Sequence, residues 1–449
     1  MYKYSQLAEN TVYSPSAFAG LEVNANAGAS VGSADKKDKA TSATRIKAID
    51  TLRGIALFLM IFVNYDAGYD ELEHAAWNGL KLADWVMPTF IFVAGASMPF
   101  SMKKQSEGAS QAQMFLVVTK RSCYLILWGL FLTGVAELWE IDDFRVPGVL
   151  QRIGLSYWLC GIVAIFIPPY PASWDSRHRD IASLAYQHLF VLLFFVGAYL
   201  LIIFFVPYVG CKTDGTDAVG YLGPGGLADN GEYRDCTGGA VGYLDRKIFT
   251  DNHLFRYPSC RQDPAILCPM PFDPEGLVAT LPSAFTMWLG YQAGWTILSF
   301  KTDMHPDRSI LIRYAVWGFT ALLLGLGLAG FSQDDGWIPI NKNLWSVSFV
   351  LVCAGSDFLA LAVLFGLLDV LMVSFLFDGG IFRALGLNSI LIYICHSLWR
   401  GYIPWRFPAF FSRTDPYTDL EQMCVALSCA LLYGLFALYL HKHKLYYAL

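Results

Sequence analysis

The sequence is poor in charge. Only 15% of its 449 residues are Asp, Glu, Lys or Arg, whereas 55% are hydrophobic and the mean hydropathy is +0.42. Soluble domains carry about 25% charged residues, so this composition excludes an ordinary soluble protein. The net charge of −5 is spread along the chain without a basic block, and we therefore expect no nucleic-acid partner.

Other signatures are missing as well. There is no CxxC pair and no His/Cys array with ligand spacing, so we expect no metal site. There is no internal repeat of the kind that many transporters show. Residues 1–44 are polar and lack the apolar core of a signal peptide. We predict that they form a disordered cytosolic tail.

Long apolar runs fill the rest of the chain, 45–449. Runs of this length with few charges are typical of membrane helices, and aromatic residues flank many of them. The sequence therefore predicts an all-α polytopic membrane protein that contacts membrane lipid. We expect about ten spans, at 50–66, 82–102, 116–136, 149–168, 186–206, 277–298, 309–330, 344–367, 384–403 and 423–440.

Basic residues predict the orientation. One set of loops carries Lys and Arg clusters, whereas the opposite loops carry E-L-E, E-I-D-D and Q-D-D. The positive-inside rule then places both termini in the cytosol. The long loop at 207–275, between the fifth and sixth spans, faces the other compartment.

This loop holds four of the ten cysteines. In an oxidising compartment they favour two disulfides, and we predict Cys211–Cys236 and Cys260–Cys268. The loop is also rich in glycine, in Y-L-G-P-G-G and T-G-G-A-V-G. These glycines can cradle a phosphate or form compact turns; the spacing fits no nucleotide motif, so we favour turns.

The stretch 49–97 carries the best site candidates. Arg53 begins its first apolar run and Asn64 ends it, and eleven residues of helix separate them by about 16 Å. His74 lies in the polar loop that follows. Asp84 begins the second run.

Further polar residues lie in or beside apolar runs. They are Arg145, Asn388, Ser389 and His396. Asn388 and His396 are eight residues apart, which predicts that they share one face of a helix. Such residues are either functional or join helices by hydrogen bonds. Asp84, Arg145 and His396 are therefore substrate-binding or structural candidates.

The motifs resemble those of the heparan-alpha-glucosaminide N-acetyltransferase family. The resemblance rests on D-T-L-R-G-I-A, H-A-A-W-N-G-L, A-D-W-V-M-P-T-F, R-V-P-G-V-L-Q-R-I-G, C-T-G-G-A-V-G-Y-L-D-R, F-D-P-E-G-L, G-W-I-P-I-N-K-N-L-W-S and L-N-S-I-L-I-Y. These motifs cover about residues 45–449 in order. This sequence departs from the animal members, which usually have a luminal domain and an extra helix before the D-T-x-R-G motif.

The resemblance implies a function. Family members transfer acetyl from cytosolic acetyl-CoA to the terminal glucosamine of heparan sulfate inside the lysosome. The family's catalytic histidine matches His74, and its asparagine at the end of the preceding helix matches Asn64. The expected partners are acetyl-CoA, heparan sulfate or another glucosamine acceptor, and membrane lipid; a homodimer is an open alternative. The expected location is the lysosomal membrane.

The residues suit this chemistry. His74 can remove the proton from the amine, and Asn64 can stabilise the oxyanion that forms on the thioester. Arg53 and Arg121 lie at cytosolic helix ends, where they can bind the CoA phosphates, and we assign Asn388 and Ser389 to the cofactor site. Two routes stay open, a covalent acetyl-His74 or direct transfer, and we favour the direct one. The rival hypothesis is a transporter of a sugar or organic anion.

Overall fold

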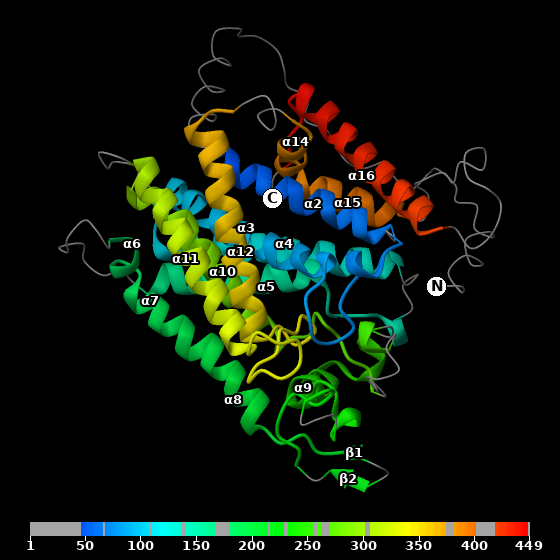
Figure 1. Ribbon diagram of the computed structural model, residues 1–449. Coiled ribbons are helices and arrows are strands. Elements are labelled where there is room, and N and C mark those ends of the chain that lie inside the picture. The colour runs from blue at the N-terminus through cyan, green and yellow to red at the C-terminus, as the bar shows by residue number, and fades with distance from the viewer. Residues whose placement is uncertain are drawn as a thin grey trace, which may run out of the picture. The chain divides into compact units, whose positions relative to one another are not determined.

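The computed structural model describes residues 46–65, 68–106, 109–136, 141–167, 179–213, 216–218, 220–228, 232–255, 258–261, 270–300, 306–373, 380–400 and 418–447. These belong to one compact unit, Ile46–Leu449. The predicted tail, 1–44, lies outside the described residues. The described part is mainly helical, which confirms the predicted all-α class (Figure 1).

Most helices are long. The long ones are α2 (Lys47–Asn64), α3 (Leu82–Ser106), α4 (Gln111–Ala136), α5 (Val149–Phe166), α10 (Thr280–Phe300), α11 (Pro306–Leu328), α12 (Val347–Phe365) and α16 (Asp419–Lys442). The shorter ones are α6 (Arg179–Ala182), α7 (Ala185–Phe190), α8 (Ala198–Phe205), α9 (Gly239–Phe249), α14 (Ile381–Leu387) and α15 (Ser389–Trp399). A π-helical segment, Val191–Gly197, joins α7 to α8. Strands β1 (Cys211–Thr213) and β2 (Thr216–Ala218) form a small antiparallel ribbon.

The number of membrane spans differs from the prediction of ten. Seven helices among the described residues are long and apolar enough to cross a membrane, or eight if the bent pair α14 and α15 is one span. Helices α2 and α10 lie where spans were expected but are more polar. Much of their surface is buried against other helices, so lipid does not require it to be apolar. The chain is a multi-pass membrane protein.

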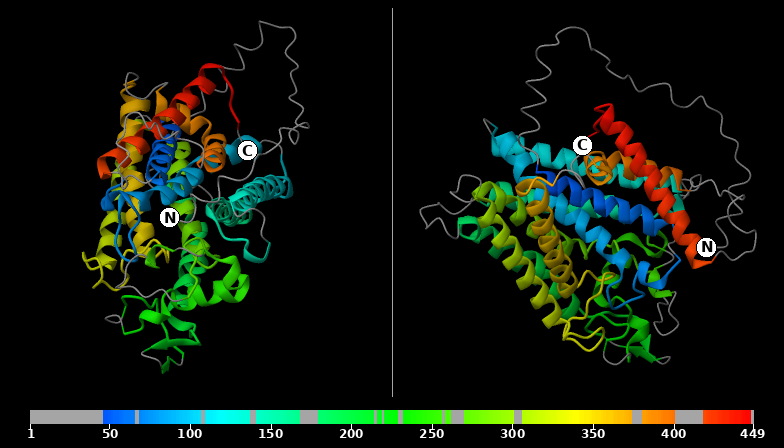
Figure 2. Two further views of the ribbon diagram at one scale, coloured as in Figure 1. Left: turned by 90° about the vertical axis from the view of Figure 1, so that its right-hand side faces the viewer. Right: turned by 45° about the horizontal axis from the view of Figure 1, so that its top comes forward.

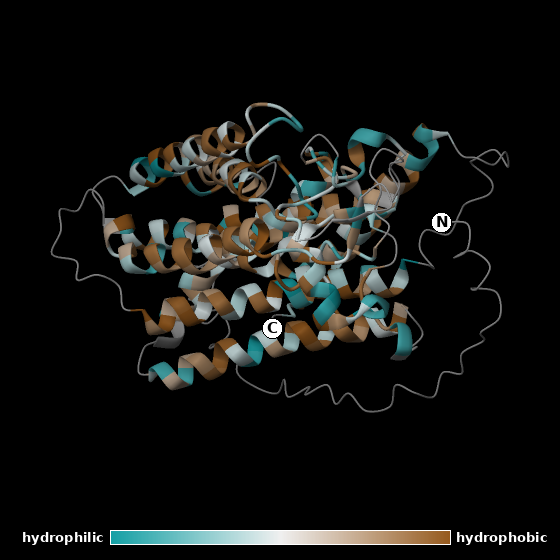
Figure 3. Cartoon of the chain, turned by 90° about the horizontal axis from the view of Figure 1, so that it is seen from below, coloured by the Kyte–Doolittle hydropathy of each residue, from teal (hydrophilic) through white to brown (hydrophobic). Residues whose placement is uncertain are grey.

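Helices α2 and α10 are the centres of packing. Helix α2 lies beside α3, α12, α14 and α16, whereas α10 packs on α3, α5 and α12 (Figures 1 and 2). Glycines allow the closest approach: a Cβ at Gly54 would lie 1.6 Å from the Phe382 carbonyl oxygen, and one at Gly290 would lie 1.9 Å from that of Phe92. Hydrophobic residues run along the long helices, and polar colour gathers at helix ends and in loops (Figure 3).

The predicted span at 384–403 is wrong in shape. The chain bends by 91° at Asn388, between α14 and α15. The Asn388 amide turns to the C-terminal segment, where it donates to the Leu445 carbonyl at 3.1 Å and accepts from the Tyr447 N–H at 3.1 Å. Asn388 stands just before α15, the helix that carries His396, and the expectation that the two residues share one helix face stays a prediction.

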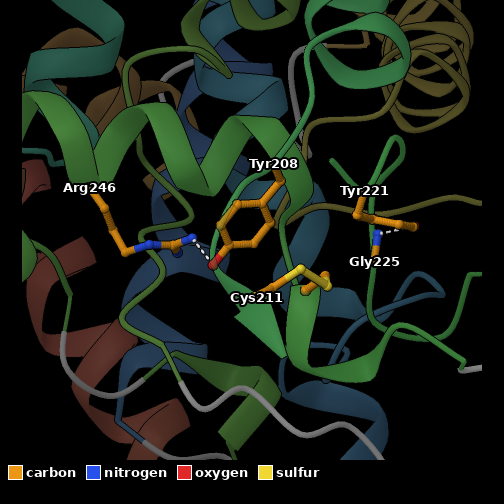
Figure 4. Close-up of a disulfide and its surroundings, with 6 residues drawn as sticks. Tyr208, Cys211, Tyr221, Gly225 and Arg246 are labelled. Carbon is orange, nitrogen blue, oxygen red and sulfur yellow. Dashed lines mark hydrogen bonds between the residues drawn. A yellow bond between two sulfur atoms is a disulfide. The ribbon is translucent and has the colours of Figure 1, made fainter. Parts of the chain in front are cut away.

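The described residues of 207–275 lie between α8 and α10 and include α9 and the β1–β2 ribbon. A disulfide joins Cys211 to Cys236, as predicted, with Cα atoms 5.2 Å apart (Figure 4). Cys260 is also disulfide-bonded. The predicted pair Cys260–Cys268 stays a prediction, because Cys268 lies outside the described residues.

The glycines of this region form turns. Gly225 has a φ of +64°, and a Cβ there would lie 2.1 Å from the Cys236 carbonyl oxygen. The Gly225 N–H donates to the Tyr221 hydroxyl at 2.9 Å, and Arg246 donates to the Tyr208 hydroxyl at 2.8 Å (Figure 4). The glycine segment thus packs backbone on backbone around the disulfide, in agreement with the compact-turn interpretation.

Candidate active site

Two loops that are distant in the sequence build the surroundings of His74. The loop after α2 and the loop before α12 lie side by side (Figure 1) and meet at a bridge between Asn78 and Asn341. The Gly79 N–H donates to the Ile340 carbonyl at 2.8 Å, and the Asn341 amide donates to Asn78 Oδ1 at 3.1 Å. This pairing fixes the first loop against the second.

His74 is held by Asp84. The His74 Nδ1 lies 2.8 Å from Asp84 Oδ1, and the other carboxylate oxygen accepts the Ala75 N–H at 3.1 Å and the Lys81 N–H at 3.0 Å. The Asp84 side chain is fully buried, whereas that of His74 is 43% exposed. Asp84 stands in the first turn of α3, where the helix dipole favours a carboxylate. When His74 Nδ1–H donates to the Asp84 carboxylate, the Nε2 lone pair is left to accept a proton.

Lys342 completes this cluster. Its ammonium Nζ lies 3.0 Å from His74 Nδ1, 3.3 Å from His74 Nε2 and 3.8 Å from Asp84 Oδ1. The Lys342 side chain is mostly buried. Since Nδ1 faces Asp84, Nε2 is the ring nitrogen that can accept a proton from this ammonium. The site therefore already holds a primary ammonium beside a histidine base.

Arg145 belongs to a neighbouring ion-pair cluster. Its guanidinium binds both oxygens of Asp273, at 2.8 and 2.6 Å, and also binds Glu275. Burial would lower the pKa of Arg145, but Asp273 and Glu275 raise it above its ordinary value. Burial likewise would raise the pKa of Glu275, yet Arg145, and next Lys342, lower it to about 2. The charge of Lys342 thus links this cluster to the His74 cluster.

Asn64 pairs with His396. The Asn64 Nδ2 lies 3.3 Å from His396 Nε2, and the rings of Tyr65 and Tyr433 contact the His396 imidazole edge-on. His396 is 2% exposed. The Asn64 amide uses one of its N–H groups in this bond, so the second remains to meet a ligand. Within the described residues, Asn64 hydrogen-bonds to His396 and not to His74.

The predicted phosphate anchors lie among other helices. Arg53 donates to Asp50 at 3.2 Å, to the Gly386 carbonyl at 3.4 Å and to the Ser97 hydroxyl, so it joins α2 to α14 and α3. Arg121 lies over the Tyr157 ring, 4.9 Å from its centroid, between α4 and α5. The structure does not bring Arg53 and Arg121 into contact with each other in the part of the chain that it describes.

The other two cofactor candidates lie at the bend. Asn388 is fully buried and holds the C-terminal segment, as described above. Ser389 is the first residue of α15. Their assignment to the cofactor site stays a prediction.

Sequence reasoning missed three residues of the site. Lys342, Asp273 and Glu275 all lie in motifs that carry the family resemblance, G-W-I-P-I-N-K-N-L-W-S and F-D-P-E-G-L. A charged residue inside such a motif was the available signal. Asp273 and Glu275 lie 128 and 130 residues from Arg145, and Lys342 lies 268 residues from His74, so local spacing could not pair them.

The fold and the site together define a class, a multi-pass helical membrane protein with a His–Asp pair at one end of its helices. Residues 45–174 match the family model described as heparan-alpha-glucosaminide N-acetyltransferase, catalytic. The chain is 36% identical over 417 residues to the human heparan-alpha-glucosaminide N-acetyltransferase, covering 90% of this chain and 60% of that protein.

The mouse protein of the same name is also 36% identical, over 421 residues, with 91% of this chain and 61% of the relative covered. The recognition of the heparan-alpha-glucosaminide N-acetyltransferase family from the motifs is confirmed. The chain spans about 60% of the length of these curated relatives.

Proposed function

We propose that this protein is an acetyl-CoA-dependent N-acetyltransferase that acetylates the amine of a terminal glucosamine of heparan sulfate or a related amino sugar. The names of the two relatives support this activity. The observation that carries the proposal is the His74–Asp84 pair, 2.8 Å apart, with the Lys342 ammonium 3.0 and 3.3 Å from the two ring nitrogens of His74. The Lys342 ammonium occupies the position beside His74 where the amine of an amino sugar would bind after displacing it.

His74 acts as the general base. The acceptor amine must lose a proton before its nitrogen lone pair can attack the thioester carbonyl. His74 Nε2 takes that proton, while Asp84 fixes the ring through Nδ1 and stabilises the imidazolium. Direct transfer needs no covalent acetyl-His74, and we favour it for that reason.

Asn64 is the second catalytic residue of the proposal. Carbon–nitrogen bond formation places negative charge on the thioester oxygen, and an amide N–H can stabilise it. The contact with His396 leaves the second Asn64 N–H for this purpose and fixes the orientation of the amide. His396 is then a positioning residue.

Acetyl-CoA is the donor, and its phosphates require cations at the end of the bundle opposite His74. Arg53 stands in the first half of α2 and Asn64 is its last residue, so eleven residues of unbroken helix separate them by about 16 Å. An extended pantetheine arm can join phosphates at the Arg53 end to a thioester at the Asn64 end. Arg121 is the second proposed phosphate ligand, because a guanidinium suits phosphate oxygens.

We further propose a lysosomal membrane location with both termini in the cytosol. The basic clusters of the loops support this orientation through the positive-inside rule. The disulfides at Cys211, Cys236 and Cys260 suit an oxidising compartment on the His74 side of the membrane.

Measuring acetyl transfer and acetyl-CoA binding separately in the same variants tests the proposal. In detergent, His74→Gln should lower single-turnover transfer to glucosamine by about 10²–10⁴-fold and leave acetyl-CoA affinity nearly unchanged. Arg121→Ala should weaken acetyl-CoA affinity, because a phosphate loses a charge-assisted contact. Lys120→Ala, at the exposed neighbouring position, is the matched control. Near-normal transfer by His74→Gln would move the active site elsewhere.

A further inference from the structure

We infer that Lys342 is itself an acetylation site, which accepts the acetyl group of acetyl-CoA when no amino sugar is bound. The inference rests on the proposed function, because it uses the same donor and the same base. It concerns the chain's own amine at that site. Neither relative's name refers to it.

Geometry singles out this lysine. The Lys342 Nζ lies 3.0 Å from His74 Nδ1 and 3.3 Å from Nε2, close to the reach of about 2.6–3.2 Å at which a base takes a proton. Asp84, 3.8 Å away, stabilises positive charge on that nitrogen. The Asn78–Asn341 bridge keeps the two loops together, so Lys342 stays beside His74 without any ligand.

A second lysine nearby provides a contrast. Lys81 lies at the start of α3, on the same side of the molecule, and is more exposed than Lys342. Its Nζ pairs with Asp70 at 2.6 Å, whereas Lys342 contacts His74. Chemical acetylation that depended only on exposure would favour Lys81. Acetylation that depends on the base His74 selects Lys342.

The reaction balances with acetyl-CoA as the only co-reactant. The Lys342 ammonium gives a proton to His74 Nε2, and the neutral nitrogen attacks the thioester carbonyl carbon. A carbon–nitrogen bond forms and the carbon–sulfur bond breaks. The CoA thiolate takes one proton, so one further proton is released to water for each amide formed.

Two consequences follow for the enzyme. An alkylammonium is a weaker acid than an ammonium on a sugar ring, so Lys342 should react more slowly than the acceptor. An acceptor amine that occupies the space beside His74 must also displace Lys342. Acetyl-CoA without acceptor should therefore acetylate Lys342 slowly, and acceptor should protect it. The product amide has no charge, so the positive charge beside Asp84 is lost.

Mass spectrometry of the full-length protein tests this. Detergent-solubilised enzyme is incubated with deuterated acetyl-CoA, with or without glucosamine, and peptides containing Lys342 and Lys81 are quantified. We expect label at Lys342 that grows with time, falls at least about ten-fold in His74→Gln, and is suppressed by glucosamine. Lys81 should stay unlabelled, and matched thermal melting should establish that His74→Gln is folded.

The outcomes separate the two proposals. An enzyme that acetylates glucosamine but leaves Lys342 unlabelled overturns this inference and leaves the proposed function standing. Equal labelling of Lys81 and Lys342, or equal labelling in His74→Gln, also overturns it, because the chemistry would then need no base. Protein that acetylates neither glucosamine nor Lys342 contradicts both.

Discussion

At the scale of single residues, the orientation of the His74 ring depends on Asp84. The carboxylate is fully buried, and it holds three groups, the His74 ring and the backbone N–H groups of Ala75 and Lys81. The two backbone contacts fix the carboxylate whatever the state of the ring. Asp84 can therefore select which ring nitrogen of His74 is free to act as the base.

Asp84→Asn should separate the effect of the carboxylate charge on His74 from the effect of the side-chain shape. An asparagine keeps the size of the side chain and one acceptor, but it cannot stabilise an imidazolium at His74. We expect kcat to fall by about 10²–10⁴-fold with little change in acetyl-CoA affinity. Steady-state kinetics with glucosamine measures this. The control is Asp70→Asn, at an exposed residue whose carboxylate contacts Lys81. Equal kcat values for wild type and Asp84→Asn would remove Asp84 from the mechanism.

The raised pKa of Asp245 predicts that the stability of the protein depends on pH. It is buried in α9, where burial raises its pKa to about 7, against the opposing effect of the N–H groups of Val278 and Leu277. A carboxyl group with a pKa near 3.9 in the unfolded chain then binds its proton more tightly in the folded chain. Stability should therefore fall as the pH rises from about 4 to about 7, by at most about 1.4 kcal/mol per pH unit.

Thermal melting at pH 5 and pH 7 checks this sign. Wild type should melt at a higher temperature at pH 5, and Asp245→Asn should reduce the difference between the two pH values. Asp251→Asn, at an exposed residue just after α9, is the control. A wild-type protein more stable at pH 7, or an unchanged pH difference in Asp245→Asn, would contradict the assignment.

At the scale of elements, the contact between α2 and α14 depends on two glycines. A Cβ at Gly54 would lie 1.6 Å from the Phe382 carbonyl oxygen, and one at Gly386 would lie 1.8 Å from that of Asp50. Both contacts are with backbone, which cannot move aside without shifting a helix. Arg53 donates to the Gly386 carbonyl across the same contact.

Gly54→Ala and Gly386→Ala should therefore each destabilise the protein by about 1–3 kcal/mol or more. Acetyl-CoA affinity should fall with stability, because Arg53 loses its neighbour. Melting temperature in detergent and acetyl-CoA binding are the measurements. Gly327→Ala is the matched control: it also lies in a long helix, α11, and a Cβ there meets nothing within 4 Å. If Gly54→Ala and Gly386→Ala both melted at the wild-type temperature, this result would show that α2 and α14 are not in contact.

The sequence predicted the helices better than their breaks. The span predicted at 50–66 agrees with α2, Lys47–Asn64, within a few residues, because local hydrophobicity sets this helix. The bend at Asn388 was not predicted, because its cause is a contact with Leu445 and Tyr447, 57 and 59 residues further on. Hydrophobicity alone gives no information about such a contact.

The same limit applies to the candidate site. His74 and Asp84 are ten residues apart, so one stretch of sequence presented both, although their hydrogen bond was not foreseen. Lys342 is 268 residues from His74, and only the packing of two loops brings it there. Asn64 and His396 were both candidates, but their pairing across 332 residues also required the fold.

At the scale of the whole molecule, the proposed function uses both ends of one helical bundle. Arg53 and Asn64 stand in the two halves of α2, and the His74 cluster follows the Asn64 end. The disulfide-bonded region between α8 and α10 is linked to that same end by Arg145, which binds Asp273 and Glu275. Under the proposed function, the protein takes its donor from one face and its acceptor from the other.

Acetyl transfer between reagents placed on opposite faces of the membrane tests this central claim most directly. Sealed vesicles of controlled orientation receive labelled acetyl-CoA on the predicted cytosolic face and glucosamine on the opposite face. The account predicts labelled acetylglucosamine on the glucosamine side, and its loss in His74→Gln. Transfer only when both reagents share one face, transfer that survives His74→Gln, or glucosamine that crosses the membrane without being acetylated would contradict the account.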